Sequence, residues 1–485
     1  MRHACSCALA WERFISLRTL HTRAWTVVSL LGLLVSQEAV ASNSFHSDSL
    51  IPRERISPQR GPSSGFEEGP DSSFVVAVVE AGPSNLYSEA FWDALADLDL
   101  ATSRKTARSD AETEFARAME LLTAGSHLEA ENAFANLSTY KGDLNVAVAA
   151  QMMLAHTLLY ERKWSRLRDL PENSALGASD QQTTSDLERW GHAFANIEPQ
   201  STVFPTAPVS LPMRVTAVGT PSIRVKINGK EYEFWLDTGS TMTVLSSEVA
   251  DATQVPIISA DTLKVRTFGG HARVRPALVR KLQVGPIVIT NSPAIVIDAS
   301  MMRLQTSSNG APWAGEHVDG ILGWDFIRQF NVVLNYQTGK ATFATPEELG
   351  VNGTDAQNLT WAGEPLVEVR SKSGATLHFS LDTGAQSTFI NATVLEKMGA
   401  TTRVATGRVS GIARTGAPTR RVVPTLTVKV GRKSLRLEDV VVYGPSYSGL
   451  IGCDGILGSD LARFGAIRID ATNGIFSVGP EAESV

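Results

Sequence analysis

The chain has 485 residues, of which 43% are hydrophobic, and this length predicts two or three domains rather than one core. The formal net charge of −6 is spread without long runs of like charge, which argues against a nucleic-acid-binding surface. Of the 3 cysteines, Cys5 and Cys7 fall in a segment that we expect to be removed, which leaves Cys453 without a disulfide partner. Cys453 precedes an apolar run, and this context favours a buried small side chain over a nucleophile.

The N-terminus has the pattern of an export signal. Arginines precede an apolar run from Trp25 to Val35, and Ala39-Val40-Ala41 is a small-residue cleavage pattern. We therefore expect residues 1–41 to be a signal peptide and the mature protein to be exported, either periplasmic or secreted, with an uncleaved N-terminal membrane anchor as the alternative. Residues 42–72 are rich in Ser, Gly and Pro, which predicts a disordered linker. No later segment is long and apolar enough to span a bilayer, so we expect no membrane span in the mature chain.

Residues 73–200 are expected to form an α-helical region. Phe115, Met119 and Leu122 recur at helical spacing, and similar apolar groups follow in three further segments. Two helical hairpins of this kind resemble tetratricopeptide-like repeats, which would make the region a docking module for a protein partner. A helical cap or prodomain is the alternative. Three prolines between residues 205 and 212 predict a linker after the helices.

The rest of the chain is predicted to be rich in β-strands, and it repeats itself. Alternating β-branched and charged residues end at Asn228-Gly229, a strong signal for a tight hairpin turn. The segment Phe234–Ser240 (FWLDTGS) returns 145 residues later as Phe379–Ala385 (FSLDTGA). Downstream, Val318–Asp325 (VDGILGWD) returns 135 residues later as Cys453–Asp460 (CDGILGSD). Two motifs that recur in the same order at nearly the same spacing indicate two homologous lobes.

Each half also contains a glycine-containing hairpin candidate in its middle. Glycine permits the positive φ angle that a hairpin tip needs. The candidate residues are Phe268, Gly269 and Gly270 in the first half and Ser410, Gly411 and Ile412 in the second.

The doubled pattern of two hydrophobic residues, Asp-Thr-Gly and then Ile-Leu-Gly resembles the retropepsin-like and pepsin-like aspartic proteases, in particular their bacterial exported branch. The resemblance implies a mainly β fold, with two acid-protease β-barrel lobes at 213–348 and 362–480 forming a pseudo-dimer. It also implies that Asp237 and Asp382 are the catalytic pair and that the glycine hairpins are flaps that close on the substrate. The supporting catalytic loops would comprise Thr238, Gly239, Ser240, Thr383, Gly384 and Ala385, with the two threonines hydrogen-bonded across the lobe interface.

The chemistry of peptide hydrolysis explains why such a site needs two carboxyl groups. Two carboxylates about 3 Å apart cannot both ionise at low cost, so they share one proton. The ionised group takes a proton from water while the protonated group polarises the scissile carbonyl. Ser240 follows the first triplet and Ala385 follows the second, so we hypothesise that the Ser240 hydroxyl donates to the Asp237 carboxylate and makes Asp237 the more ionised partner.

The chain also departs from the retroviral pattern. Those enzymes often carry an arginine after Ile-Leu-Gly that pairs with an aspartate beyond the catalytic triplet, whereas Trp324 and Ser459 occupy these positions here. Docking of the lobes should therefore depend on other contacts. The four aspartates of the second motif are expected to be turn or cap residues and not catalytic groups. They are Asp319, Asp325, Asp454 and Asp460.

The sequence thus predicts an aspartic endopeptidase that acts on a peptide or protein substrate, without cofactor or metal. The histidines lack metal-ligand spacing and there is no cysteine cluster. The alternative is a non-catalytic peptide- or protein-binding module on the same fold, with the helices as its docking region. Neither substrate preference nor pH optimum follows from the sequence.

Overall fold

The computed structural model of the protein describes a set of ranges that all belong to one compact unit. They are residues 89–171, 187–267, 270–304, 316–346, 357–406, 410–411, 414–415, 419–443, 446–448 and 450–480. The predicted signal peptide and the linker at 42–72 lie outside these residues. No helix among the described residues has the length and apolar character required to cross a membrane.

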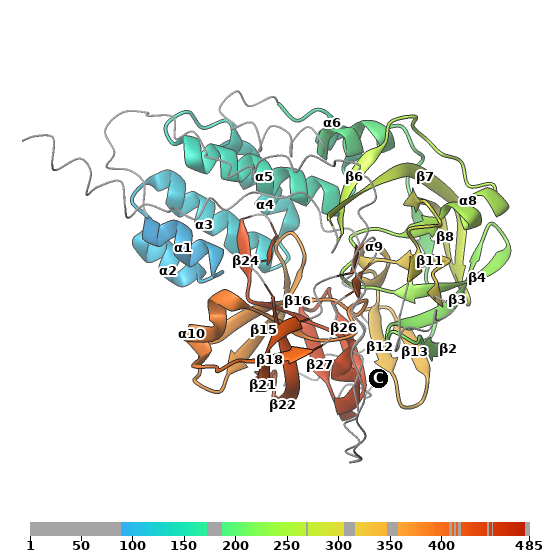
Figure 1. Ribbon diagram of the computed structural model, residues 1–485. Helices are drawn as coiled ribbons and strands as arrows, with labels where there is room; N and C mark the ends of the chain where they lie inside the picture. Colours follow the sequence, from blue (N-terminus) through green and yellow to red (C-terminus); the bar gives the residue numbers. More distant parts are fainter. Residues whose placement is uncertain are drawn as a thin grey trace, which may run out of the picture. The chain divides into compact units, whose positions relative to one another are not determined.

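A helical region comes first (Figure 1). Its helices are α1 (Glu89–Ala96), α2 (Leu100–Thr106), α3 (Asp110–Thr123), α4 (His127–Ser138), α5 (Leu144–Tyr160) and α6 (Trp164–Arg168), followed by a helical stretch at 187–194. The side chains of Ser109 and Asp143 cap α3 and α5 by accepting hydrogen bonds from Glu112 N and Val146 N. These two helices begin 34 residues apart, which is the length of a tetratricopeptide repeat. The assignment to that repeat class stays a prediction.

The first lobe follows the helices. Its strands are β1 (Ser201–Val203), β2 (Val209–Val215), β3 (Pro221–Ile227), β4 (Lys230–Leu236), β5 (Val244–Ser246), β6 (Leu263–Thr267), β7 (Gly270–Val284), β8 (Ile287–Ile297), β9 (Arg303–Leu304), β10 (Glu316–His317), β11 (Gly320–Leu322), β12 (Asn331–Asn335) and β13 (Lys340–Ala344), with helices α8 (Ser247–Ala252) and α9 (Trp324–Ile327). Six strands in the order β3-β4-β11-β5-β8-β7 form a barrel that is closed by pairing between β7 and β3. The alternation in β3 explains its orientation, because Ile223, Val225 and Ile227 are buried while Arg224 and Lys226 are exposed.

The second lobe repeats this arrangement. Its elements are β14 (Leu359–Trp361), β15 (Pro365–Ser371), β16 (Thr376–Leu381), β17 (Phe389–Asn391), η1 (Ala392–Val394), α10 (Leu395–Met398), β18 (Arg403–Thr406), β19 (Ser410–Gly411), β20 (Arg414–Thr415), β21 (Thr419–Val430), β22 (Lys433–Tyr443), β23 (Ser446–Ser448), β24 (Ile451–Cys453), β25 (Gly455–Leu457), η2 (Ser459–Phe464), β26 (Ile467–Asp470) and β27 (Ile475–Val478). Six strands in the order β15-β16-β25-β17-β22-β21 form a second barrel, closed by pairing between β21 and β15. The predicted mainly β fold with two barrel lobes and a preceding helical region is confirmed.

The lobes share a sheet in which β12 of the first lobe pairs with β26 of the second. Strand β2 pairs with β13 and β3, and β1 pairs with β8. The linker predicted from the prolines between 205 and 212 is therefore wrong in part. Pro212 lies inside β2, opposite Lys340, and the flanking strands already belong to the first lobe.

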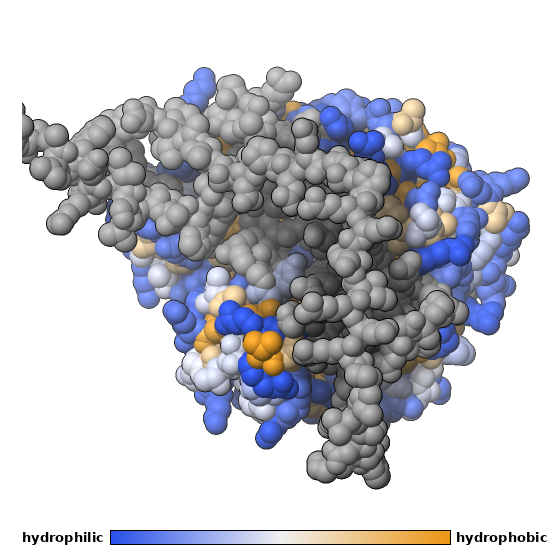
Figure 2. Space-filling view, in the orientation of Figure 1, coloured by the Kyte–Doolittle hydropathy of each residue, from blue (hydrophilic) through white to orange (hydrophobic). Residues whose placement is uncertain are grey.

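The surface carries separate apolar residues rather than one large patch among the described residues. The most exposed large hydrophobic side chains lie on different elements, such as Leu128 on α4, Val203 on β1 and Val404 on β18. Figure 2 shows a mostly hydrophilic described surface with small hydrophobic areas.

Candidate active site

Asp237 and Asp382 stand at corresponding positions of the two barrels. Each follows the end of a buried strand, β4 or β16, which pairs in parallel with the Ile-Leu-Gly strand of its lobe. The amides of Asp237 and Asp382 donate to Leu322 O at 3.1 Å and to Leu457 O at 3.0 Å. Both aspartates are nearly inaccessible, at 1% and 4% exposure. The Ile-Leu-Gly strands thus hold the two aspartate loops in place.

A reciprocal set of hydrogen bonds joins the two aspartate loops. Thr238 N donates to Thr383 Oγ1 at 3.1 Å, and Thr383 N donates to Thr238 Oγ1 at 3.0 Å. Each hydroxyl in turn donates to a carbonyl of the other lobe, Thr238 to Leu381 at 2.8 Å and Thr383 to Leu236 at 2.7 Å. The predicted bonding of the threonines across the lobe interface is confirmed.

The glycines of the triplets bring the carboxyl groups together. A Cβ placed on Gly239 would lie 2.5 Å from Cγ of Asp382, and one placed on Gly384 would lie 2.5 Å from Cγ of Asp237. Each carboxyl group therefore packs against the backbone of the opposite loop. Only a residue without a Cβ permits this approach. Both acidic groups consequently meet at the interface of the lobes.

Each carboxylate also accepts a backbone hydrogen bond within its own loop. Asp237 Oδ1 accepts from Gly239 N, and Asp382 Oδ1 accepts from Ala385 N, both at 2.9 Å. The hydroxyl of Ser240 donates instead to Met242 O at 2.8 Å. Since a hydroxyl has one proton to donate, the hypothesis that Ser240 donates to Asp237 and makes it the more ionised partner is wrong.

This geometry gives a prediction for Ser240→Ala. The substitution removes the bond to Met242 and should cost about 1 kcal/mol of stability. It should not shift the acid limb of the pH–rate profile, because the Ser240 hydroxyl donates its proton to Met242 O and not to the Asp237 carboxylate. The profile of kcat/KM against pH tests this expectation, and a shift of that limb to higher pH would restore the original hypothesis.

The aspartates of the second motif have structural roles. Asp319 Oδ2 accepts from Glu233 N at 3.0 Å, and Asp454 Oδ2 accepts from His378 N at 2.8 Å. Asp325 accepts from the Thr243 hydroxyl at 3.2 Å, and the Thr388 hydroxyl donates to Asp460 Oδ1 at 2.8 Å. None of these bonds involves the central pair, which agrees with the prediction that these aspartates are not catalytic. The prediction of turn or cap residues is wrong, because Gly323 and Gly458 occupy the N-cap positions and the aspartates bond to strand amides and hydroxyls.

Asp454 gives a pH-dependent prediction for stability. Burial raises its pKa to about 6, against the opposing bond from His378 N. A raised carboxyl pKa means that the folded state binds the proton more tightly than the unfolded state. The contribution of this proton to the free energy of unfolding is therefore fully present below about pH 4 and is lost as the pH rises through about 6.

We expect Asp454→Asn to remove up to about 3 kcal/mol of this pH dependence of unfolding between pH 4 and 6. Asp319→Asn is the matched control, because Asp319 makes the same kind of bond at a more exposed position. Urea unfolding of the variants at several pH values measures both effects, and parallel curves for wild type and Asp454→Asn would contradict the prediction.

A buried polar cluster helps to join the lobes in place of the ion pair that the sequence lacks. On β12, Asn331 Nδ2 donates to Asp470 Oδ2 at 2.8 Å, and Arg468 Nε donates to Asn331 Oδ1 at 3.2 Å. Arg468 also lies 3.5 Å from Asp470. The sequence reasoning did not find these residues, because they follow the motifs and carry no pattern of their own.

The hairpin candidates form paired strands, while their predicted role as flaps stays untested. Strands β6 and β7 pair from Leu263↔Val274 to Thr267↔Gly270. In the second lobe, Ser410 and Gly411 pair with Thr415 and Arg414. Phe268, Gly269 and Ile412 lie outside the described residues.

Two further predictions concern reactive or metal-binding groups. Cys453 is buried, its Sγ donates to Gly455 O at 2.7 Å, and burial raises the pKa of its thiol. It is therefore the inert side chain that was predicted. Within the described ranges, no group of three or more His, Cys, Asp or Glu side chains could hold a metal ion.

Comparison with known proteins agrees with the two-lobed site. A family model described as "Aspartyl protease" matches residues 223–326 and again residues 367–461, so each lobe matches separately. Among solved structures, the chain is similar to a retropepsin-like aspartic protease from Rickettsia conorii, at 14% identity and a TM-score of 0.20. That similarity covers 30% of this chain and 94% of the other. No curated protein matches the chain.

Proposed function

Because the aspartyl protease family model matches each of the two barrel lobes, we propose that the chain is an aspartic endopeptidase in which Asp237 and Asp382 act as one catalytic pair. The observation that carries the proposal is the reciprocal packing of each carboxyl group against the glycine of the opposite loop. This packing supports a shared proton, since two adjacent carboxylates cannot both ionise at low cost.

In the proposed reaction, one carboxylate removes a proton from a water molecule as the water attacks the scissile carbonyl carbon. The other carboxyl group donates a hydrogen bond to the carbonyl oxygen and stabilises the tetrahedral intermediate. Collapse of the intermediate breaks the C–N bond, and the departing amine takes up a proton from the pair. Because the two carboxyl groups would share one proton, the pair should titrate as a unit.

A peptide library tests the proposal. Purified protein would be incubated with an unbiased mixture of peptides from about pH 3 to about pH 8, and mass spectrometry would identify new termini. The proposal predicts cleavage within peptides at a pH where one carboxyl group is protonated. Peptides that bind without being cleaved at any pH would support the non-catalytic binding module instead.

We also propose that the protein is exported. The apolar run and the small residues that precede Ser42 support this location. Fractionation of cells that produce the full chain, with N-terminal sequencing of the product, tests the proposal. An intact N-terminus in a membrane fraction would favour the uncleaved anchor.

A further inference from the structure

The turn between α5 and α6 places an arginine where the preceding helical hairpin has a glycine. After α3, Gly125 adopts a φ of 81°, with Gly125 N and Ser126 N donating to Leu122 O and Leu121 O. After α5, Arg162 adopts a φ of 56°, and the same two bonds run from Arg162 N and Lys163 N. This left-handed position favours glycine, and a residue with a Cβ occupies it at a cost in free energy. Leu98 and Gln254 occupy the same kind of turn with positive φ, so the contacts of the Arg162 side chain, and not the backbone conformation, show what this residue does.

The side chain of Arg162 reaches the first lobe. Its Nη2 donates to the backbone oxygen of Asp325 at 2.6 Å and lies 3.8 Å from Asp325 Oδ2. The arginine side chain is 19% exposed and that of Asp325 is 9% exposed, so the two charges meet away from water. Burial lowers the pKa of Arg162 to about 10, and Asp325 opposes this shift. Burial also raises the pKa of Asp325, with Arg162 the main opposing influence.

Asp325 in turn contacts the loop that carries Asp237. Its carboxylate accepts from the Thr243 hydroxyl, and its amide donates to Thr241 O at 3.3 Å. The neighbouring amide of Trp324 donates to Ser240 O at 2.6 Å. The start of α9 is thus bonded to three residues that follow the Asp-Thr-Gly triplet. Arg162 acts on that loop through Asp325.

The second lobe has the same loop contacts without a residue from the helices. Ser459 N donates to Ala385 O at 2.7 Å, and Asp460 accepts from Thr388. The cation that influences Asp460 is Arg463, from the same short helix. The aspartate that supports the Asp237 loop therefore has its cation on the helices, whereas Asp460 has its cation within its own lobe.

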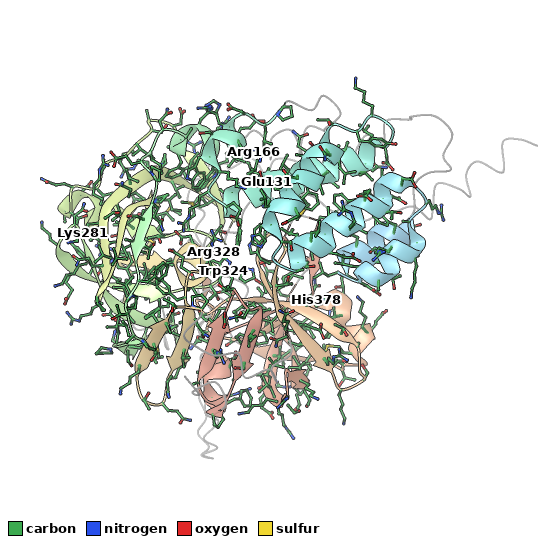
Figure 3. The ribbon with its side chains drawn as sticks, turned by 180° about the vertical axis from the view of Figure 1, so that it is seen from behind. Glu131, Arg166, Lys281, Trp324, Arg328 and His378 are labelled. Carbon is green, nitrogen blue, oxygen red and sulfur yellow. The ribbon has the colours of Figure 1, made fainter. Side chains whose placement is uncertain are left out.

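Other contacts hold the α5–α6 turn in place. Arg328 Nη2 donates to Tyr160 O at 2.5 Å, and its guanidinium lies 3.8 Å from the centre of the Tyr160 ring; Arg328 and Trp324 are labelled in Figure 3. The Tyr160 ring also lies 4.1 Å from that of Trp361 in the second lobe. The hydroxyl of Thr360 donates to Thr123 O at the end of α3. The helices are therefore bonded to both lobes by buried and half-buried groups.

We propose that Arg162 is a positioning residue for the Asp237 loop, so that the helical region is a working part of the active enzyme and not a segment that must be removed. Trp324 stands where retroviral enzymes often carry an arginine, and the Arg162 guanidinium supplies a cation next to this position, paired with Asp325. The effect on turnover rests on the proposed peptidase function, whereas the effect on the loop does not.

The comparison with Gly125 provides the test variant. Arg162→Gly removes the guanidinium and keeps a residue suited to the left-handed turn, so the turn itself should fold. Arg162→Lys retains a charge, and Arg104→Gln removes an exposed ion pair with Glu120 elsewhere in the helices as the control. We expect Arg162→Gly to lower kcat about tenfold with little change in KM, since the loop acts on the reacting groups. Arg162→Lys should recover part of this loss, and Arg104→Gln should match wild type.

Hydrogen exchange provides a readout that does not need activity. In Arg162→Gly, the amides of Gly239, Trp324 and Asp325 should exchange at least about tenfold faster, while those of Ala385 and Ser459 in the second lobe should not change. Adding Asp325→Asn to Arg162→Gly should produce no further loss of kcat. Unchanged exchange in the Asp237 loop would overturn the proposal, and so would wild-type kcat in Arg162→Gly. Faster exchange in a protein that cleaves no peptide would refute the peptidase function and leave the role of Arg162 in positioning the loop.

Discussion

Replacing either Asp237 or Asp382 with asparagine is expected to lower kcat/KM by at least about a thousandfold. The amide can neither take a proton from water nor share one with the remaining carboxylate. Each aspartate holds a position that the other cannot fill, because each packs against the glycine of the opposite loop. The double variant should lose little more than either single one, since the two groups act as a unit.

The same substitutions should leave the fold intact. Asparagine retains the oxygen that accepts from Gly239 N or Ala385 N, and it removes repulsion between two buried acidic groups. The thermal midpoint should therefore be unchanged or higher. Asp319→Asn is the control, because it alters a carboxylate of the same lobe that bonds to Glu233 N and does not belong to the pair. Equal cleavage by wild type and both single variants would exclude the catalytic assignment.

A single methyl group on either triplet glycine should have the second large effect. In Gly239→Ala, the new Cβ would lie 2.5 Å from Cγ of Asp382, and in Gly384→Ala it would lie equally close to Asp237. Such a contact is too short to persist, so the carboxyl group or the loop must move. We expect a loss of at least about a hundredfold in kcat/KM and about 1–3 kcal/mol in stability.

The control for this prediction is Gly374→Ala. Gly374 has a φ of 90° and nothing within 4 Å of its Cβ position, so the substitution strains the backbone without a clash. It should cost about 1–2 kcal/mol of stability and leave the activity unchanged. Denaturant unfolding and peptide cleavage, measured on the same preparations, separate the two effects. A Gly384→Ala protein with wild-type turnover would show that the carboxyl groups do not need this close approach.

The catalytic assignment could be made from the sequence because its signal is local and doubled. Each lobe contains an apolar strand, an Asp-Thr-Gly triplet and an Ile-Leu-Gly segment, and these features appear twice in the same order. The crossed bonds of the two threonines were expected from the resemblance of these triplets to those of aspartic proteases. Alternation likewise predicted the strand before Asn228-Gly229, which the structure has as β3.

The orientation of individual side chains was not predictable in the same way. Ser240 directly follows the triplet, yet its hydroxyl finds Met242 O because the turn brings that carbonyl within 2.8 Å. The prolines between residues 205 and 212 suggested a linker, but Pro212 lies in β2, where pairing with β13 and β3 outweighs its weak strand preference. In both cases a tertiary contact determined the observed conformation, which the local sequence left open.

The amino-acid sequence by itself thus determined the two lobes, their paired aspartates and the loops that hold them, because short-range patterns encode these features. Tertiary structure alone decided what supports the first loop. Arg162 is separated from Asp325 by 163 residues, and no spacing rule links a helical turn to a distant carboxylate. Their meeting depends on how the helices pack on both lobes, which is set by the summed burial of many side chains rather than by any motif.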